Sequence, residues 1–249
     1  MPAHSIAFDN LSKLYGATAA VDGVTLEIEA GTFVALVGTS GSGKSTLLQC
    51  VNRLVGPTAG RVLLDGHDVA SEPAHALRRR IGYVFQTIGL FPHMTVAKNI
   101  AIGPRIAGRA VEVGPLLDLV ALPRELATRM PAELSGGQRQ RVGLARALAP
   151  GAGVLLLDEA FGALDPVTRD LLGREVRGLH DRLGLTTILV THDMAEALLL
   201  ADRVLVMRAG RIVADASPAD LAAGRGGEAA QALMAVPRAQ AERLRVLAE

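Results

Sequence analysis

The chain has 249 residues, a formal net charge of +1, 49% hydrophobic residues and 20% charged residues. This composition excludes a disordered chain and indicates a globular protein with one large domain, or one domain followed by a tail. The near-zero net charge gives no electrostatic basis for nucleic-acid binding, and the single cysteine, Cys50, excludes an internal disulfide.

Targeting signals are not evident. The N-terminal residues MPAHSIAF lack a basic stretch followed by an apolar one, so they do not resemble a signal peptide. No apolar run reaches the roughly 18–20 residues that a membrane-spanning helix requires. We therefore expect a soluble, cytoplasmic protein, with any membrane role exercised through a partner.

The first elements are short strands and one helix. Residues 6–8 and 24–28 are predicted strands, with Tyr15 in the loop between them. Residues 32–37 form an apolar run that is typical of a buried parallel strand. Residues 45–54 have helical character and contain no glycine or proline.

Between that strand and that helix lies a phosphate-binding pattern. The sequence GTSGSGKS fits G-x-x-x-x-G-K-[ST], in which glycines let backbone N–H groups point at phosphate oxygens and the helix N-terminus adds positive charge. The lysine of the pattern reaches the β- and γ-phosphates, and the hydroxyl that follows it can ligate Mg²⁺. The predicted phosphate-binding residues are Gly38, Thr39, Ser40, Gly41, Ser42, Gly43, Lys44, Ser45 and Thr46.

The middle of the chain changes from sheet to helix. Residues 61–64 and 81–85 are predicted strands, and residues 74–80 form a short predicted helix. From residue 88 onward helical spacing dominates, with an N-cap at Thr95 and helices over 116–120 and 139–149. Segment breaks are predicted at Pro104, Gly108, Gly114 and Pro115. We expect a mostly helical subdomain, about 88–150, inserted into the sheet domain.

The sheet then resumes and ends in a tail. Residues 154–157 and 186–190 are predicted buried strands, and helices are expected over 166–183 and 194–200. Residues 203–207 and 211–214 are expected to pair in a hairpin around Ala209 and Gly210. Ser217 caps a helix with Pro218 at its first position. The domain is expected to span 1–220, and 221–249 a helical tail interrupted at Pro237.

Two carboxylates follow the strand at 154–157. Asp158 and Glu159 stand at its carboxyl end, where ligands bind in open α/β sheets. One carboxylate can hold Mg²⁺, and its neighbour can orient and deprotonate a water for attack on a γ-phosphate. Taken alone, these two residues are better explained as an ordinary acidic pair at a strand end, which is common in α/β proteins.

A second motif, Leu134-Ser-Gly-Gly-Gln138, changes that balance. Together with the phosphate-binding pattern it resembles the signature of the ATP-binding-cassette (ABC) family. The resemblance implies an α/β P-loop NTPase fold with an inserted helical subdomain and an N-terminal antiparallel β subdomain. It also implies ATP and Mg²⁺ as ligands, and a head-to-tail homodimer in which Ser135, Gly136, Gly137 and Gln138 bind the ATP of the partner.

The other family motifs follow in the expected order. By resemblance, the adenine ring stacks on Tyr15, and Gln86 senses both Mg²⁺ and the membrane partner. Residues 163–165 cross the dimer interface. The implied catalytic residues are Glu159 as the base, His192 at the γ-phosphate and Gln86, and the implied metal ligands are Ser45, Gln86 and Asp158. Two departures from the common pattern, Ala160 and Gly162, remove no catalytic group.

Within the family, residues 86–100 and 130–148 are most similar to importers of quaternary-amine osmoprotectants such as glycine betaine, carnitine and choline. The resemblance implies two integral-membrane permease subunits, an extracytoplasmic substrate-binding protein, and a location on the cytoplasmic face of the inner membrane. Gln86 to Phe91 is the expected docking surface, with Leu90 and Phe91 exposed; the alternative is that these two side chains pack inside the helical subdomain. Longer members append regulatory modules after this region, and we expect none of these in a chain ending at Glu249.

Other functions are weighed against the transport hypothesis. Importers of amino acids, methionine or oxyanions fit the same motifs. A DNA-repair cassette needs a long coiled coil between its two nucleotide motifs, but only about 90 residues separate Lys44 from Ser135 and no sustained heptads occur there. A translation-associated cassette protein usually carries two cassettes in one chain, whereas this chain has one.

Overall fold

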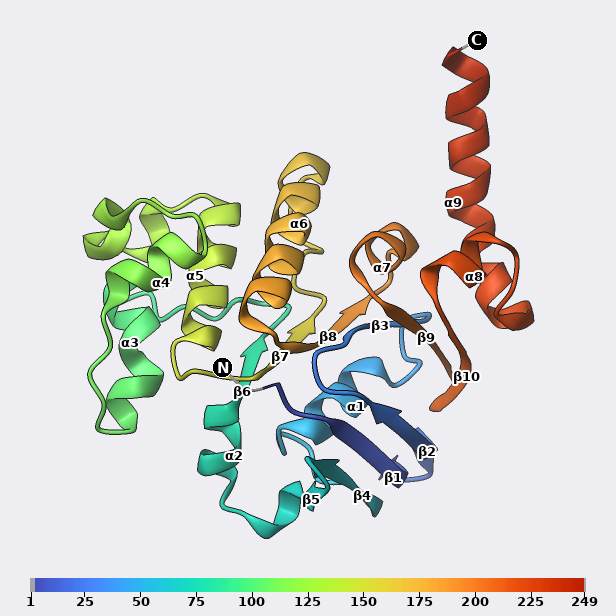
Figure 1. Ribbon diagram of the computed structural model, residues 1–249, viewed down its shortest axis with the longest axis horizontal. Coiled ribbons are helices and arrows are strands. Elements are labelled where there is room, and N and C mark those ends of the chain that lie inside the picture. The colour runs from blue at the N-terminus through green and yellow to red at the C-terminus, as the bar shows by residue number, and fades with distance from the viewer. Residues whose placement is uncertain (1–2, 249) are drawn as a thin grey trace.

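Two β-sheets organise the protein, and the computed structural model describes residues 3–248 (Figure 1). A four-stranded antiparallel sheet has the order β2-β1-β4-β5, and a six-stranded sheet has the order β10-β9-β3-β8-β7-β6. The first sheet comprises β1 (Ile6–Tyr15), β2 (Thr18–Ile28), β4 (Ala59–Leu64) and β5 (His67–Asp68). The second comprises β3 (Phe33–Val37), β6 (Ile81–Val84), β7 (Val154–Asp158), β8 (Thr186–Thr191), β9 (Arg203–Arg208) and β10 (Arg211–Ala216).

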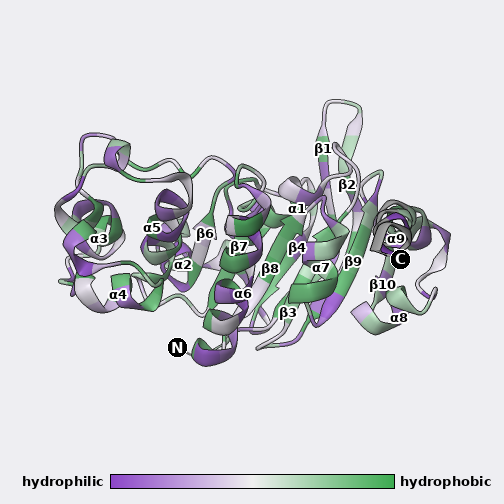
Figure 2. Ribbon diagram, turned by 90° about the horizontal axis from the view of Figure 1, so that it is seen from above, coloured by the Kyte–Doolittle hydropathy of each residue, from purple (hydrophilic) through white to green (hydrophobic). Residues whose placement is uncertain are grey.

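The central strands are continuous apolar runs because both of their faces are covered. Every residue of β3, β7 and β8 is buried, as expected for parallel strands between two layers. Figure 2 shows hydrophobic residues concentrated along these strands and β9. Within the six-stranded sheet, only β10 runs antiparallel to its neighbour, and it pairs with β9 through the hairpin at Ala209 and Gly210.

Helices cover the parallel sheet in groups (Figure 1). On one face lie α6 (Pro166–Leu183) and α7 (Met194–Leu200), and α1 (Lys44–Val51) lies on the other with the antiparallel sheet. On the same face as α1, α2 (Ala74–Arg80) packs below β6, and the helical segment stands beyond β6, whereas the two C-terminal helices stand beyond β10. The helical segment contains α3 (Val96–Ile106), α4 (Val113–Leu119) and α5 (Gly136–Leu148), with short 3₁₀ helices at Arg124–Thr128 and Pro131–Glu133. Another 3₁₀ helix, Val69–Ser71, precedes α2. The C-terminal helices are α8 (Pro218–Ala222) and α9 (Gly227–Ala248).

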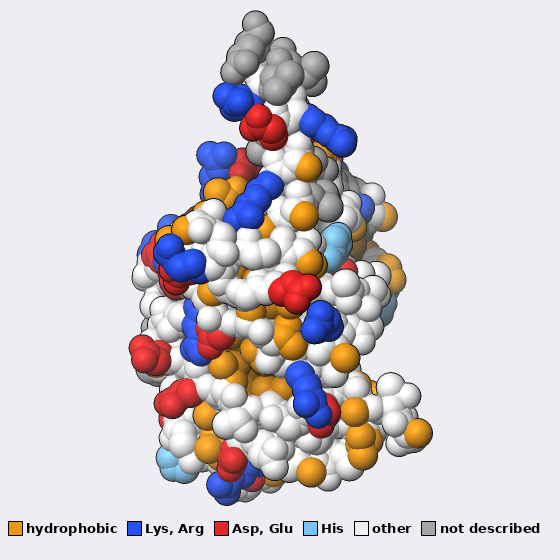
Figure 3. All heavy atoms as spheres, turned by 90° about the vertical axis from the view of Figure 1, so that its right-hand side faces the viewer, with side chains coloured by type: hydrophobic (Ala, Val, Ile, Leu, Met, Phe, Trp, Pro, Cys, Tyr) orange, Lys and Arg blue, Asp and Glu red, His pale blue; other side chains and the backbone are white. Residues whose placement is uncertain are grey.

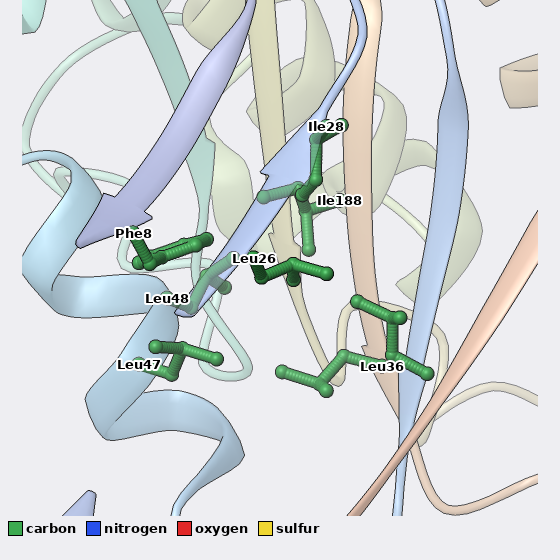
Figure 4. A pocket seen from close by; sticks show the side chains of 8 residues that line it. Phe8, Leu26, Ile28, Leu36, Leu47, Leu48 and Ile188 are labelled. Atoms are coloured by element: carbon green, nitrogen blue, oxygen red, sulfur yellow. The ribbon is translucent and has the colours of Figure 1, made fainter. Parts of the chain in front are cut away.

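The parallel sheet separates two hydrophobic cores. One core joins the α6–α7 face to the helical segment, and the other joins α1 to the antiparallel sheet. Figure 4 shows apolar side chains of the second core converging from both sheets and α1. They are Phe8, Leu26, Ile28, Leu36, Leu47, Leu48, Ile188 and Leu205. This packing fixes the position of α1, and therefore of the loop that precedes it.

Strand register brings the sequence motifs to one edge of the sheet. Val37, the last residue of β3, pairs with Thr191, the last residue of β8. Asp158, the last residue of β7, pairs with Val190. The phosphate loop, the acidic pair and His192 therefore all follow strands that end at the same edge.

Several predicted elements are confirmed, and some boundaries are wrong. Thr95 and Ser217 cap helices as expected, and Asp165 caps α6. Tyr15 does not lie in a loop, because β1 and β2 pair up to Tyr15 and Thr18. The first helix is Lys44–Val51 rather than 45–54, since Asn52 leaves helical geometry.

Three prolines and one glycine do not act as the predicted breaks. Pro104 lies inside α3, Gly114 and Pro115 lie in the first turn of α4, and Pro237 lies inside α9. A proline removes one hydrogen bond from the helix ladder, but its own φ angle suits a helix, so flanking residues can continue the turn. The end of the predicted tail, Glu249, lies outside the described residues.

The surface carries mixed charge. On the face formed by β10, α8 and α9, basic and acidic side chains are interspersed, with apolar side chains exposed between them (Figure 3). Among residues 3–248, no helix combines the length and the hydrophobicity of a membrane span.

Candidate functional site

The phosphate loop between β3 and α1 lies tightly against neighbouring backbone. Gly43 has φ +106°, and a Cβ at this position would lie 2.0 Å from the carbonyl oxygen of Ala20. A Cβ on Gly38 would lie 2.2 Å from the carbonyl oxygen of Met207. These two glycines are therefore required for the loop to fit between β2 and β9, in addition to any role toward a phosphate.

Lys44 is held inside the loop. Its Nζ donates to the carbonyl oxygens of Gly38 and Thr39, at 2.9 Å each, and the residue is 5% exposed. Burial lowers the pKa of the Lys44 ammonium, while the nearby carboxylates of Glu159 and Asp158 oppose that shift. The loop thus holds a buried cation at the N-terminus of α1, which is an arrangement that suits a polyphosphate.

Asp158 links the loop to the sheet through both carboxylate oxygens. Ser45 Oγ donates to Oδ1 at 2.7 Å, and the hydroxyl of Tyr83 on β6 donates to Oδ2 at 2.7 Å. Burial, and then the hydrogen bond to Asp158, raise the pKa of the Tyr83 phenol, so it remains a donor. The Asp158 carboxylate is consequently fixed beside the Ser45 hydroxyl.

These oxygen donors fit Mg²⁺. Mg²⁺ is usually held by one or two protein oxygens, with water and substrate phosphates completing six ligands. Ser45 and Asp158 supply such a pair, and the described residues contain no group of three or more His, Cys, Asp and Glu side chains suited to a metal. A fit therefore depends on phosphate oxygens at the adjacent loop.

Glu159 begins a turn immediately after β7. Its φ is +47°, an uncommon value for a residue with a side chain, and its N–H donates to the carbonyl of Val190 on β8 at 3.0 Å. Its Oε2 accepts from Gln86 Nε2 at 3.2 Å and lies 3.6 Å from His192 Nδ1. The three residues implied as catalytic are therefore neighbours at the edge of the sheet.

The signature motif serves as the N-terminus of α5. Ser135 and Gln138 form a reciprocal capping box, with Gln138 N donating to Ser135 Oγ and Ser135 N donating to Gln138 Oε1. Gly137 packs so closely on α6 that a Cβ there would lie 2.8 Å from Thr168 Cγ2. Within residues 3–248, no hydrogen bond or ion pair joins Ser135–Gln138 to the phosphate loop.

Tyr15 stands apart from this cluster. It is 52% exposed at the end of β1, with Lys13 Nζ 5.1 Å from its ring centroid. It pairs with Thr18, two residues before the Ala20 carbonyl that touches Gly43. The ring is thus accessible on the hairpin that flanks the phosphate loop.

Sequence reasoning missed three residues of the site. Tyr83 donates a hydrogen bond to Asp158. Arg169 and Glu196 line a small cavity together with Glu159 and His192. Tyr83 could have been found, since it is one of two tyrosines and lies on a predicted strand. Arg169 and Glu196 carry no motif signal and are common residue types on helix surfaces.

Comparison with known proteins places the chain in a family. A profile described as ABC transporter matches residues 21–162, which is more than half of the chain. This chain belongs to the ABC transporter family. The matched region includes the phosphate loop, the signature motif and the acidic pair.

Curated relatives in the family extend the comparison. The choline transport ATP-binding protein OpuBA of Bacillus subtilis is 45% identical over 222 residues, covering 87% of this chain and 58% of the relative. The glycine betaine uptake system ATP-binding protein YehX of Escherichia coli is 49% identical over 218 residues, covering 86% and 71%. The sulfate/thiosulfate import ATP-binding protein CysA of Caulobacter vibrioides is 52% identical over 217 residues, covering 84% and 63%. The chain thus spans little more than half the length of OpuBA.

A solved structure has the same fold. A dimeric ATP-binding cassette in a post-hydrolysis state, bound to ADP and Pi, aligns with a TM-score of 0.76 at 30% identity, covering 86% of this chain and 98% of that one. The fold expected from the motifs, a P-loop α/β domain with a helical insertion and an antiparallel β subdomain, is therefore confirmed.

Proposed function

We propose that this chain is the ATP-hydrolysing motor subunit of an ABC importer. The observation that carries the proposal is the convergence of a phosphate loop, a hydroxyl–carboxylate pair and a Glu–Gln–His cluster at one sheet edge. Bound Mg²⁺ would neutralise developing phosphate charge beside Ser45 and Asp158. Lys44 would hold the β- and γ-phosphates.

Glu159 is the proposed general base. Its carboxylate accepts a proton from the water whose oxygen attacks the γ-phosphorus, and the bond from phosphorus to the β-phosphate oxygen breaks to give ADP and phosphate. Gln86 and His192 contact the same carboxylate oxygen and orient it. His192 is 64% exposed on its side chain, so it remains accessible to a γ-phosphate.

Substitution of Glu159 tests this role. Glu159→Gln keeps the shape and removes the base, so turnover should fall by about 10²–10⁴, the usual contribution of a general base. Phosphate release by the purified full chain is the measurement. Glu228→Gln, at an exposed position on α9, is the matched control and should hydrolyse ATP like the wild type. Near-normal hydrolysis by Glu159→Gln would contradict the assignment.

We propose further that two copies form a head-to-tail dimer. Within residues 3–248, no hydrogen bond or ion pair joins the signature helix end to the phosphate loop, and we infer that the N-terminus of α5 faces the nucleotide of a second copy. Sedimentation of Glu159→Gln with Mg²⁺ATP should show a dimer that dissociates when ATP is removed. A species that stays monomeric at saturating ATP and high protein concentration would count against a homodimer.

The proposed partners are two integral-membrane permease subunits, and through them an extracytoplasmic binding protein, with this subunit on the cytoplasmic face of the inner membrane. Phe85, next to Gln86, and Phe91, five residues after it, are 42% and 41% exposed and are the proposed contacts with a permease. Leu90, expected to be exposed, is instead half-buried against the core, because the segment turns its side chain toward the helical segment. Leu90 is therefore not part of the proposed docking surface, although the sequence predicted that it would be.

The proposed solute is a quaternary amine such as glycine betaine, choline or carnitine, which the names of OpuBA and YehX support. The identity to CysA supports sulfate or thiosulfate as the second candidate. Uptake of labelled glycine betaine, choline and sulfate should be compared in wild-type and Glu159→Gln cells at low and high osmolarity. Loss of betaine or choline uptake alone supports the first candidate, and loss of sulfate uptake alone replaces it with the second.

A further inference from the structure

Arg169, on the first turn of α6, joins two segments that carry proposed catalytic residues. Its Nη2 donates to the carbonyl oxygens of Leu164 at 3.0 Å and of Gly162 at 3.4 Å. These carbonyls belong to the loop that begins at Glu159. Only 27% of the Arg169 side chain is exposed, so the guanidinium lies between the loop and the next helix.

The other side of the guanidinium faces the segment around His192. Nη1 lies 3.6 Å from Asp193 Oδ2, and Nε lies 3.7 Å from Glu196 Oε1. Glu196 in turn accepts from Thr191 Oγ1 at 2.6 Å, and Thr191 Oγ1 accepts from the N–H of Asp193 at 3.0 Å. His192 is therefore flanked in sequence by Thr191 and Asp193, and both residues are linked to the guanidinium, Asp193 directly and Thr191 through Glu196.

A small cavity marks this junction. Its lining includes Glu159, Gly162, Arg169, His192 and Glu196. Arg169 Nε is buried and has no hydrogen-bond partner among the described residues, since 3.7 Å to Glu196 is too long for a hydrogen bond. The Nε–H of Arg169 therefore makes no hydrogen bond in this geometry, and a movement of less than about 1 Å would bring it within hydrogen-bond distance of Glu196.

We propose that Arg169, with Glu196 as its anionic partner, is a positioning residue that holds the loop of Glu159 and the segment of His192 in one mutual geometry. This inference rests on the proposed hydrolysis. Within residues 3–248, Arg169 forms no hydrogen bond or ion pair with the phosphate loop or with Ser45. Its loss should therefore affect the chemical step rather than nucleotide binding.

The charge on Arg169 also affects Glu196. Burial raises the pKa of the Glu196 carboxyl, while the hydrogen bond from Thr191 and the charge of Arg169 oppose the shift. Without the guanidinium, the ionised form of Glu196 would be less stable, and the hydrogen bond that it accepts from Thr191 would be altered. Arginine suits this position because its planar fork can meet two carbonyls and two carboxylates at once, which a lysine ammonium cannot.

The experiment compares Arg169→Gln, Arg169→Lys, Glu196→Gln and the double variant with wild type. The matched control is Arg174→Gln, on the same helix: its side chain is 75% exposed, and within the described part of the chain it forms an ion pair with Asp170 alone. ATP hydrolysis by the full chain gives kcat and KM, and hydrogen exchange is followed over residues 159–165 and 190–194.

For Arg169→Gln we expect kcat to fall about 10-fold to 100-fold with KM for ATP nearly unchanged, because small misplacements of reacting groups have effects of that size. Arg169→Lys should be intermediate, and the double variant no slower than the slower single variant, since both act through one link. Exchange should accelerate in both segments of Arg169→Gln, while Arg174→Gln should match wild type throughout.

Two results would overturn the proposal. One is wild-type kcat and wild-type exchange in Arg169→Gln, and the other is a rise in KM together with a lowered melting temperature, which would indicate a folding role. If the wild type itself fails to hydrolyse ATP, the proposed function is refuted. In that case the exchange measurement decides this inference separately, and unchanged exchange in Arg169→Gln rejects the link between the segments.

Discussion

At the scale of single residues, Asp158 illustrates how position rather than identity gives a side chain its role. Its two oxygens are divided between Ser45 from the phosphate loop and Tyr83 from β6. Neighbouring Glu159 has the same functional group but faces Gln86 and His192. The change in backbone direction at Glu159, with φ +47°, separates the two carboxylates into different surroundings.

Tyr83 gives a prediction at this scale. Tyr83→Phe removes the hydrogen bond to Asp158 Oδ2, which frees the carboxylate to rotate away from Ser45. The Mg²⁺ concentration needed for half-maximal hydrolysis should rise about 10-fold to 100-fold, as is usual when a partner of a metal ligand is lost. Nucleotide binding measured in EDTA is the control and should be unaffected. An unchanged Mg²⁺ dependence would show that Ser45 alone positions Asp158.

At the scale of elements, the connection from β3 to α1 is determined by backbone approach. Gly41 and Gly43 both have positive φ, at +75° and +106°. A Cβ on Gly41 would meet nothing within 4 Å, whereas one on Gly43 would lie 2.0 Å from the Ala20 carbonyl oxygen. The two positions therefore separate conformational strain from steric overlap.

Alanine substitutions test that separation. Gly41→Ala should lower the free energy of unfolding by about 1–2 kcal/mol, the cost of a left-handed residue with a side chain. Gly43→Ala should cost about 1–3 kcal/mol more, because β2 must also move. Urea unfolding of the two variants gives the comparison. Equal costs would mean that the contact between the loop and β2 relaxes freely.

At the scale of the whole molecule, stability depends on how α6 is joined to the sheet. His180 on α6 is 3% exposed, its Nδ1 lies 3.0 Å from Thr187 Oγ1 on β8, and its ring packs on Phe33 of β3 at 5.2 Å between centroids. Burial, and then the charge of Arg177, lower the pKa of the His180 imidazole from 6.5. The folded protein thus keeps this histidine neutral.

The sign of the pH dependence follows. Because the unfolded chain protonates His180 at a higher pH than the folded protein does, the free energy of unfolding should fall as pH falls below about 6.5, until the lowered folded pKa is reached. The slope from this one group is at most about 1.4 kcal/mol per pH unit. Urea unfolding from about pH 8 to about pH 5.5 measures it. His180→Gln should flatten the profile and the exposed His75→Gln should not; the same slope in both would contradict the prediction.

Much of the fold could be predicted because the parallel strands are uninterrupted apolar runs and helix caps lie where the sequence places them. Boundaries that depend on pairing could not. Tyr15 is a strand residue only because β2 lies opposite it, and Pro104 stays within α3 because surrounding contacts support the helix. These outcomes depend on neighbours distant in the sequence.

The same division applies to function. The sequence by itself predicted the phosphate loop, because that loop needs certain residue types at fixed spacing along one backbone segment. The acidic pair and the signature motif gained a predicted role only through their resemblance to a known family. Only the tertiary structure decided that Tyr83 supports Asp158 and that Arg169 spans from Leu164 to Glu196. Such contacts are made by common side chains across separate elements. Their partners are set by strand register and helix packing, which no short stretch of sequence encodes.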